Sequence, residues 1–417
     1  MMTSRRLFLS GASAFAASLV AGGARAQDVL NDLLRAAGQS GWNDTFDARS
    51  SNSTKVQSTR SIFSQHTISY TEQAIGQYHN LVAQGGWERV PDTKKLKLGV
   101  VDPDVVALRK RLMVSGDLPR NAGLSQSFDS YVDAAVKRFQ MRHGLPADGV
   151  LGKYSYLAIN ISARTRLGQL ETNLVRLREK TGSLGERYVL VNIPAAQIEA
   201  VEGDRVVLRH TAIVGKIDRQ TPIVNSRINE IIINPYWTAP TSIVRKDIIP
   251  LMRKNPNYLR DSKIRLFAPD GSEVDPMTLD WSTEEAARYR FRQEPGVNNA
   301  MASVKINFPS PDGVYMHDTP QQSLFGQMMR FDSSGCVRVQ NVRDLVTWIL
   351  RDTPGWNRQQ FEATIKTGET VPVAVSNPVP VHFLYASAWS TGDGVVQFRD
   401  DIYGWDGVEE LKISSAF

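Results

Sequence analysis

The sequence predicts an α+β protein in which helical regions precede a β-rich domain, and three observations support this prediction. Apolar residues recur at helical spacing early in the chain, for example at Val105, Leu108 and Leu112. From Arg187 onward, runs rich in β-branched residues alternate with turn residues, which is typical of short strands. Helix signals return between about residues 243 and 299 and interrupt the strands. We therefore expect a β-sandwich-like domain with an inserted capping subdomain, preceded by helices.

The first 26 residues have the features of an export signal. Arg5 and Arg6 precede a run of apolar and small residues, and Ala24-Arg25-Ala26 gives a small-x-small cleavage pattern. The Ser-Arg-Arg-x-Phe-Leu sequence is the twin-arginine form of such a signal. We therefore predict a signal peptide over residues 1–26 and a mature chain exported to a bacterial periplasm by the twin-arginine route.

The net charge of the chain is modest and gives no support for a nucleic-acid partner. The formal charge is +6, and removal of three arginines within the predicted signal, which holds no acidic residue, leaves +3 (6 − 3). No dense block of lysine and arginine argues for a nucleic-acid partner. After the signal, no apolar run is long enough to span a bilayer. The chain has neither paired-histidine nor multi-cysteine spacing, so we expect no metal and no cofactor.

Residues 97–161 predict a small unit of three helices. Asp102-Pro103 is a favourable helix start and Gly116 a stop. A second apolar stripe runs from Phe128 to Phe139, and a third short helix follows the Asp148-Gly149 turn. This pattern supplies an apolar core without a catalytic cluster.

Cys336 is the only cysteine in the chain, and its surroundings predict a nucleophile. A thiol needs a base and a positive local field to react near neutral pH. His317 lies nineteen positions upstream (336 − 317) and Arg338 two positions downstream. Gly335 lets the backbone approach a reacting carbonyl without a Cβ in the way. Most free cysteines are small buried apolar residues, but the Ser-Ser-Gly sequence before this one and the nearby histidine favour catalysis.

These motifs resemble those of the L,D-transpeptidases that cross-link peptidoglycan. The similarity lies in His-Asp-Thr-Pro from His317, then Leu-Phe, then Ser-Ser-Gly-Cys-Val-Arg-Val from Ser333. Within that family the chain looks like the large YcbB-type (LdtD-like) branch, which Gln220-Thr221-Pro222 and the run from Asn234 to Pro240 also match. The resemblance covers roughly residues 97–405 and implies a YkuD-type catalytic fold.

A second resemblance concerns the three-helix unit. The run from Ala134 to Leu145, followed by Asp148 to Gly152, is similar to the peptidoglycan-binding type 1 domain. That family implies binding to the cell wall. A purely scaffolding role stays open, because the matching residues are mostly core and turn residues.

The resemblance to L,D-transpeptidases implies a reaction and a role for each matching residue. The implied reaction forms 3→3 cross-links through a cysteine thioester, made from a tetrapeptide stem with release of D-alanine. Cys336 would be the nucleophile and His317 the acid–base group, with the backbone amides of Gly335 and Cys336 as oxyanion donors. The residues implied to line the turn, orient a loop or substrate carboxylate, or wall the pocket are Ser333, Ser334, Arg338, Tyr315 and Trp237.

Two questions about the site stay open at this stage. Many members of the wider superfamily have a second histidine two positions before the cysteine, where this chain has Ser334, as the YcbB-type branch does. The group that orients His317 is either the Asp318 side chain or a backbone carbonyl, because neighbouring side chains on a strand point opposite ways.

The implied partners and the competing functions follow from the same residues. The implied partners are donor and acceptor stem peptides, carbapenem inhibitors and an outer-membrane protein as a further acceptor; D-amino acid exchange and L,D-carboxypeptidase activity are alternatives. A papain-like wall hydrolase would have its cysteine before its histidine, and a sortase-like enzyme lacks the Ser-Ser-Gly sequence. A non-catalytic wall-binding protein is the rival of a different class.

The expected organisation is a signal peptide (1–26), an N-terminal helical region (27–96), a peptidoglycan-binding-like domain (97–161), a helical linker (162–186), a catalytic domain (187–376) with its capping insertion (243–299), and C-terminal strands that complete the catalytic domain (377–417).

Overall fold

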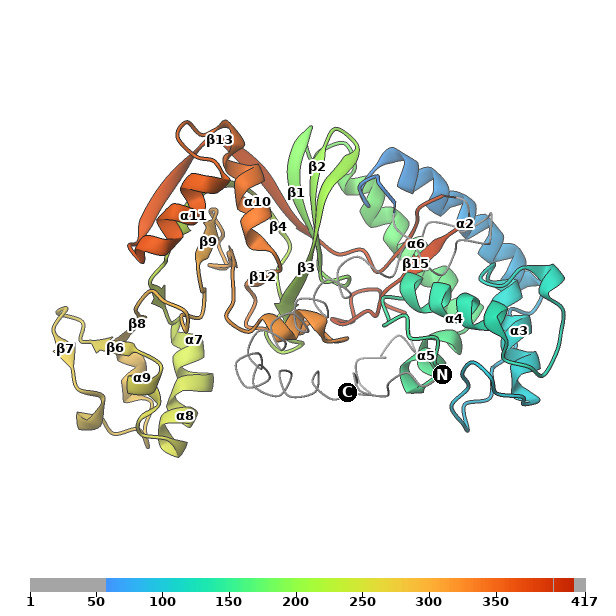
Figure 1. Cartoon of the computed structure of the whole chain (residues 1–417), viewed down its shortest axis with the longest axis horizontal. Coiled ribbons are helices and arrows are strands. Elements are labelled where there is room, and N and C mark those ends of the chain that lie inside the picture. The colour runs from blue at the N-terminus through green and yellow to red at the C-terminus, as the bar shows by residue number, and fades with distance from the viewer. Residues whose placement is uncertain (1–57, 393, 409–417) are drawn as a thin grey trace, which may run out of the picture. The chain divides into compact units, whose positions relative to one another are not determined.

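The computed structural model describes residues 58–392 and 394–408 (Figure 1). The predicted signal peptide lies outside the described residues, as do the following residues through 57 and the last nine residues, 409–417. Within the described ranges, no helix combines the length and the apolar character needed to cross a membrane.

Helices dominate the described chain before residue 187. Three of these helices begin at a polar cap: Ser64 Oγ accepts a hydrogen bond from the Thr67 amide, and Asp129 and Ser162 cap the helices that follow them. A buried apolar cluster that includes Leu108 and Phe139 holds the expected three-helix unit together. The helices are α2 (Gln65–Ala83), α3 (Asp104–Val114), α4 (Ser130–Arg142), α5 (Lys153–Ile159) and α6 (Ala163–Lys180), with a 3₁₀ turn η1 (Arg120–Ala122).

A nine-stranded sheet follows, in the order β11-β3-β12-β10-β9-β4-β13-β1-β2. Strand β3 also pairs with β2, so the two ends of this order are joined and the sheet curls back on itself. The short strands β9, β10 and β12 are neighbours in its middle. The strands are β1 (Arg187–Asn192), β2 (Gln197–Glu202), β3 (Arg205–Gly215), β4 (Val224–Ile233), β9 (Val304–Asn307), β10 (Met316–His317), β11 (Phe331–Ser333), β12 (Val337–Val339) and β13 (Val371–Leu384).

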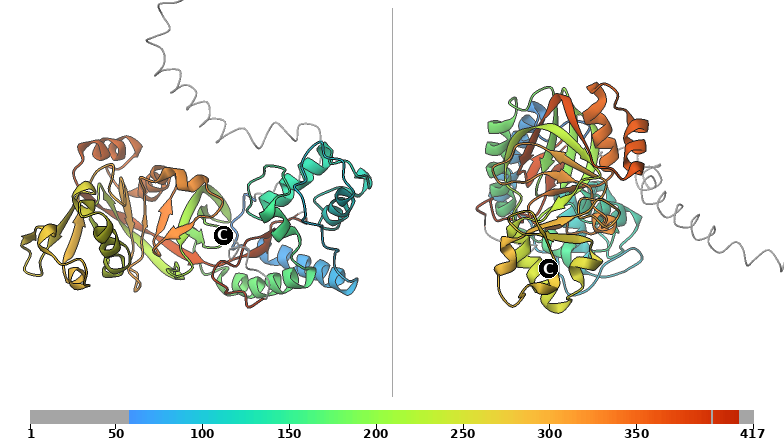
Figure 2. Two further views of the ribbon diagram at one scale, coloured as in Figure 1. Left: turned by 90° about the horizontal axis from the view of Figure 1, so that it is seen from below. Right: turned by 90° about the vertical axis from the view of Figure 1, so that its left-hand side faces the viewer.

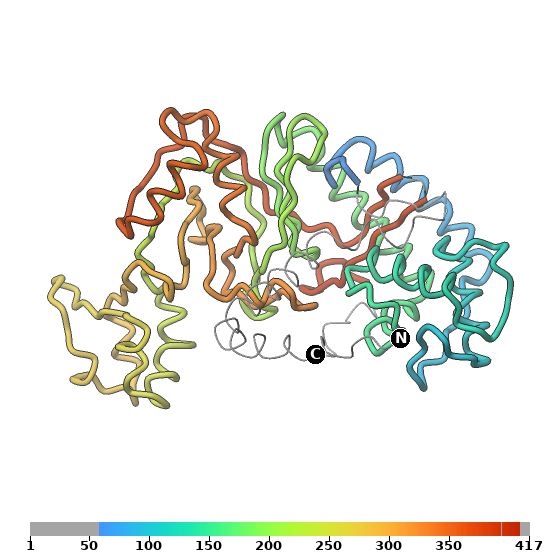
Figure 3. The backbone as a smooth tube through the Cα atoms, in the orientation of Figure 1, coloured from blue at the N-terminus to red at the C-terminus, as the bar shows by residue number. Residues whose placement is uncertain are grey.

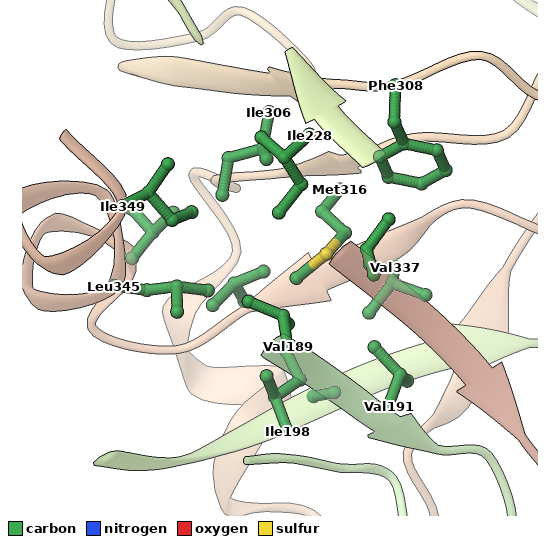
Figure 4. Packing of buried hydrophobic residues seen from close by; sticks show 14 of the residues in the cluster. Val189, Val191, Ile198, Ile228, Ile306, Phe308, Met316, Val337, Leu345 and Ile349 are labelled. Carbon is green, nitrogen blue, oxygen red and sulfur yellow. The ribbon is translucent and has the colours of Figure 1, made fainter. Parts of the chain in front are cut away.

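The main apolar core lies between this sheet and helix α10. Figure 4 shows Leu345 and Ile349 of that helix facing strand residues such as Met316, all of them fully or almost fully buried. Burial of apolar area on this scale is the main favourable term in folding. The accompanying elements are η5 (Gln322–Gly326), α10 (Val342–Ile349), η6 (Leu350–Asp352) and α11 (Arg358–Thr367).

The segment between β4 and β9 forms the cap, which has its own small sheet and core (Figure 2, gold). Its sheet has the order β5-β8-β6-β7, and Phe291 and Leu259 are fully buried against it. The elements of the cap are β5 (Trp237–Thr238), α7 (Thr241–Ile243), a π-helical turn η2 (Val244–Ile248), α8 (Ile249–Lys254), α9 (Tyr258–Asp261), β6 (Ile264–Phe267), β7 (Glu273–Val274), η3 (Pro276–Thr278), η4 (Glu285–Arg288) and β8 (Arg290–Gln293).

The C-terminal strands differ in part from the expectation. Strand β13 does complete the catalytic sheet, but β14 (Ala388–Ser390) and β15 (Val396–Phe398) form a separate hairpin. This hairpin packs against α2 and α6, as the trace in Figure 3 shows. The reason is apolar complementarity: Ala388, Val396 and Phe398 share one buried cluster with helix residues such as Leu170. Residues 377–417 are therefore divided between the catalytic sheet and the helical region within the described part of this segment.

Candidate active site

The pairing of three short strands determines which side chains share a face beside Cys336. Met316 of β10 pairs with Val337 of β12, and both side chains are fully buried in the core. Side chains alternate along a strand, so the sequence neighbours of Met316 and of Val337 point to the opposite face of the sheet. The register His317↔Arg338 and His317↔Lys305 then places an imidazole between two cations on that face.

The turn before β12 is braced from within by Ser333. Its hydroxyl donates to the Cys336 carbonyl at 2.5 Å and accepts from the Gly335 amide at 3.2 Å. Ser333 itself is buried. The structure therefore places Ser333 as an internal brace of the turn, and it shows the Gly335 amide already engaged inside that turn.

Gly335 is required by the geometry of the turn. Its φ is +113°, and a Cβ would lie 3.4 Å from the Gln220 carbonyl oxygen. The Thr221 hydroxyl donates to the Gly335 carbonyl at 2.8 Å and accepts from the Gly215 amide at 2.8 Å. The β3–β4 loop is thus fixed directly behind the nucleophile.

Opposing effects act on the Cys336 thiol, which is partly exposed. Burial raises its pKa above the ordinary value of a thiol. Hydrogen bonds from the backbone and side chain of Tyr315 act in the other direction, as do the charges of Lys305 and Arg338. Burial has the larger effect, so the resting group is a thiol that needs a base.

His317 is held as a neutral base. Its Nδ1 lies 2.5 Å from the backbone carbonyl oxygen of Asp318, which can only accept, so Nδ1 carries the proton and Nε2 keeps its lone pair. Burial, together with Arg338 and Lys305, lowers the pKa of His317 to about 3. The imidazole is therefore neutral at physiological pH and available to accept a proton.

The sequence left open whether the side chain or the backbone carbonyl of Asp318 orients His317. In the structure, the backbone carbonyl bonds to the imidazole. The carboxylate of Asp318 is engaged elsewhere: Oδ2 accepts from the Ser303 hydroxyl at 2.5 Å and Oδ1 from the Thr319 amide at 2.8 Å. It acts as a brace for the loop that carries His317.

The cap contributes one side chain to this face. Trp237, on β5 of the cap sheet, hydrogen-bonds through its side chain to Tyr315, whose ring lies 5.5 Å from that of His317. Burial raises the pKa of Tyr315 well above its usual value, so the phenol stays protonated. The two predicted pocket residues are thus linked to each other and to the thiol.

The remaining predicted residues, Ser334 and Arg338, lie on either side of Cys336. Ser334 is exposed, and its hydroxyl accepts a hydrogen bond from Arg219 at 2.9 Å. Arg338 Nη1 donates to the Gln321 side chain at 3.0 Å, which supports its predicted role in holding the loop after His317.

Sequence reasoning missed Lys305 and Arg219. Lys305 lies on β9, and only the pairing of β9 with β10 brings it to the site. Its ammonium lies 4.4 Å from the centre of the Tyr315 ring. Arg219 adjoins Gln220-Thr221-Pro222, a motif that carried a resemblance but no assigned role.

The arrangement as a whole is suited to acyl transfer through sulfur. A thiol on a turn rich in backbone amides, with a neutral imidazole on the same face of the sheet, can attack a carbonyl and form a thioester. These features define the class of site as a cysteine acyl-transfer site.

Family comparisons agree with this class. Residues 186–373 match the family model of the L,D-transpeptidase (YkuD) catalytic domain, and residues 101–154 match that of a putative peptidoglycan binding domain. The expected fold class is confirmed: a YkuD-type β-rich catalytic domain with a helical peptidoglycan-binding region and a helical region before it.

Individual proteins are similar to parts of this chain. A putative L,D-transpeptidase of Haemophilus influenzae is 33% identical over 219 residues, which are 52% of this chain and 44% of the relative. The chain thus matches less than half the length of that relative. Among solved structures, an L,D-transpeptidase from Stackebrandtia nassauensis is similar at 13% identity and a TM-score of 0.26, over 70% of this chain and 96% of that one. One from Mycobacterium smegmatis is similar at 15% identity and a TM-score of 0.24, over 47% and 58%. The family similarity rests on the catalytic-domain match and the Haemophilus relative.

Proposed function

We propose that this chain is a peptidoglycan L,D-transpeptidase that forms 3→3 cross-links through a thioester on Cys336. The observation that carries the proposal is the hydrogen bond between the lone thiol and Tyr315, whose ring lies 5.5 Å from that of the neutral His317, within the segment that matches the catalytic-domain family. The substrate would be a stem tetrapeptide, attacked at the carbonyl that joins its third and fourth residues.

The first half of the reaction follows from the charge states of the site. His317 Nε2 takes the thiol proton as Cys336 Sγ bonds to the carbonyl carbon. Collapse of the tetrahedral intermediate breaks the peptide bond, and the proton passes from His317 to the departing D-alanine amine. Lys305 and Arg338 lower the pKa of the thiol, so they favour the thiolate that forms in this step.

The second half regenerates the thiol. A side-chain amine of a neighbouring stem attacks the thioester carbonyl, His317 accepts a proton from that amine, and the proton returns to sulfur as the thioester bond breaks. The oxyanion of both tetrahedral intermediates needs backbone donors. Because the Gly335 amide is engaged with Ser333 Oγ, the Cys336 amide is the principal donor in this proposal.

The wider setting of the reaction is part of the same proposal. The twin-arginine sequence supports export to the periplasm, where peptidoglycan lies. The match over residues 101–154 supports anchoring to the wall. A carbapenem presents a strained lactam carbonyl, which the same thiol would attack; the lactam C–N bond opens and Cys336 is left acylated. The Ser-Ser-Gly-Cys sequence and the separate cap support assignment to the YcbB-type branch.

Three related activities use the same thioester and differ only in the acceptor. An outer-membrane protein or a free D-amino acid would replace the second stem, and water would make the chain an L,D-carboxypeptidase. The thioester itself is common to all of them, so the products distinguish them.

The test is to incubate the chain without residues 1–26 with purified disaccharide-tetrapeptide and to identify the products by mass. A dimer formed with loss of one alanine is expected. Release of alanine without a dimer would point to hydrolysis or to another acceptor. A Cys336→Ala variant that kept wild-type activity would exclude the mechanism, and a carbapenem adduct on Cys336 provides an independent check on the nucleophile.

A further inference from the structure

The loop between β3 and β4 places a guanidinium beside the turn that carries Cys336. Arg219 Nη1 donates to Ser334 Oγ at 2.9 Å, and Ser334 is two residues before the nucleophile. The same guanidinium forms a two-point ion pair with Asp247, with Nη1–Oδ2 at 2.5 Å and Nη2–Oδ1 at 3.0 Å. Asp247 lies on η2 of the cap. One arginine thus joins the nucleophile turn to the cap through a carboxylate.

The backbone that carries Arg219 is fixed against the nucleophile turn. A Cβ on Gly215 would lie 2.1 Å from the Arg219 carbonyl oxygen, so the loop closes this tightly only because residue 215 is glycine. The Lys216 amide donates to the Ser333 carbonyl at 3.0 Å, and Thr221 bonds to Gly335. The position of Arg219 relative to the thiol is therefore set by the fold before any ligand arrives.

The ion pair is placed where another carboxylate could replace Asp247. The Asp247 side chain is 38% exposed and that of Arg219 is 17% exposed. Asp247 is the more exposed partner of the pair, so it is the side that solvent and a ligand can reach. Arg219 Nε is buried and has no hydrogen-bond partner in the described part of the chain. Asp218 Oδ2 lies 3.8 Å from this nitrogen, an ion-pair distance that is too long for a hydrogen bond, so the donor is not used in a hydrogen bond.

We propose that Arg219 is the anchor of a carboxylate-binding subsite for the donor peptide, and that Asp247 occupies this subsite when no substrate is bound. The inference rests on the proposed function. The leaving residue of a tetrapeptide carries its carboxylate a few bonds from the carbonyl that Cys336 attacks. A planar guanidinium binds such a group at two points, as it binds Asp247 here.

The present partners of the other nearby cations favour Arg219 for this role. Arg338 donates to the amide of Gln321, and Lys305 lies over the Tyr315 ring. Arg219 alone of the three is bound to a carboxylate in a two-point geometry. Binding of the peptide would then release Asp247, so the cap would lose its ion pair with Arg219 when substrate is bound.

The test measures binding apart from catalysis, by calorimetry in a Cys336→Ala background. The ligands are disaccharide-tetrapeptide with a free and with an amidated C-terminal carboxyl group. Arg219→Gln is expected to weaken binding of the free acid by about 10- to 100-fold, since it removes charge-assisted hydrogen bonds. It should leave binding of the amide nearly unchanged. Asp247→Asn is expected to tighten binding of the free acid, because the competing carboxylate is gone.

Arg265→Gln is the matched control. Arg265 lies in the cap and, like Arg219, pairs with a carboxylate, that of Glu273, but it makes no contact with the nucleophile turn among the hydrogen bonds of the described residues. The Arg265→Gln variant should bind the free acid and the amide with the same affinities as the parent protein. In the enzyme with Cys336 intact, Arg219→Gln should raise KM for the free acid more than it lowers kcat.

The outcomes separate this subsite from the function on which it rests. Equal weakening of the free acid and the amide by Arg219→Gln, or weaker binding in Asp247→Asn, would overturn the subsite and leave a purely structural cap contact. Alanine release by the unmodified enzyme, measured in parallel, reports on the proposed function alone.

Discussion

The hydroxyl of Tyr403 donates a 2.7 Å hydrogen bond to the backbone carbonyl of Gly215, across almost the whole length of the catalytic segment. The same oxygen accepts from the Thr221 amide at 3.0 Å. Gly215 and Thr221 are the two ends of the loop that lies behind Gly335. A residue near the end of the described chain therefore supports the nucleophile turn.

Tyr403→Phe should lower both stability and activity. It leaves a buried carbonyl and a buried amide without their partner, which costs about 1–3 kcal/mol of unfolding free energy. The rate of alanine release should fall because the loop behind Gly335 loses its support. Urea unfolding and a tetrapeptide assay measure the two effects. Tyr131→Phe is the control, since Tyr131 is 66% exposed, and equal behaviour of the two variants would contradict the role given to Tyr403.

Gly335→Ala should abolish most of the activity at a moderate cost in stability. The backbone of Gly335 has a φ of +113°, which a residue with a Cβ adopts at a cost of about 1–3 kcal/mol. The turn must also shift away from the Gln220 carbonyl oxygen, which displaces Cys336. Gly313→Ala is the matched control, because Gly313 also has a positive φ, of +65°, but open space around it. If both variants kept the wild-type rate of alanine release, the turn would not depend on glycine at position 335.

The reactivity of Cys336 should follow the pH in a defined direction. Because burial raises the pKa of the thiol, alkylation by iodoacetamide should be slow at neutral pH and should rise only above the ordinary titration range of a thiol. Lys305→Met should shift this rise to still higher pH, since the lysine charge lowers the pKa of the thiol.

The acid side of the same profile tests His317. Its pKa of about 3 keeps the imidazole neutral, so the profile should show no step near pH 6.5. Lys366→Met, at an exposed position on α11, is the control and should leave the profile unchanged. A step near pH 6.5 that disappears in His317→Gln would show that the imidazole titrates at its ordinary value.

The parts of the site that depend on local sequence could be predicted, and the parts that depend on strand pairing could not. The Ser-Ser-Gly-Cys turn and the histidine before it are contiguous motifs, so Cys336 and His317 could be proposed together. Lys305 reaches the site only through the pairing of β9 with β10. No pattern within the segment 303–308 predicts its partner strand.

The same limit applies to the fold. Helical spacing and β-branched runs indicated the helical region, the strands and the cap. The strands within residues 377–417 were all expected to complete the catalytic domain, but β14 and β15 form a separate hairpin. Its packing on α2 and α6 depends on the shape of an apolar surface formed by residues over 200 positions away, such as Leu170 and Phe398. Sequence periodicity carries no such information.

A buried ion pair in the helical region gives the last prediction. Arg142 Nε and Nη2 donate to the two carboxylate oxygens of Asp117 at 2.7 and 2.6 Å, and both side chains are almost fully buried. Arg142 Nη1 also donates to the Val396 carbonyl at 3.0 Å, which ties the hairpin to α4. Asp117→Asn leaves a buried guanidinium without its counter-charge and should cost about 3–5 kcal/mol of unfolding free energy.

The comparison that tests this is an exposed ion pair, which joins two helices. Glu72 of α2 pairs with Arg178 of α6, with side chains 43% and 58% exposed. Glu72→Gln should change the unfolding free energy by about 1 kcal/mol or less, because solvent screens the pair. Urea unfolding of both variants measures the difference. Since Arg142 supports the hairpin, Asp117→Asn should also increase hydrogen exchange in β15. Equal losses of stability in the two variants would show that burial of the Asp117 pair adds nothing, and protection of β15 equal to that of the wild type would remove the proposed link between the helical region and the hairpin.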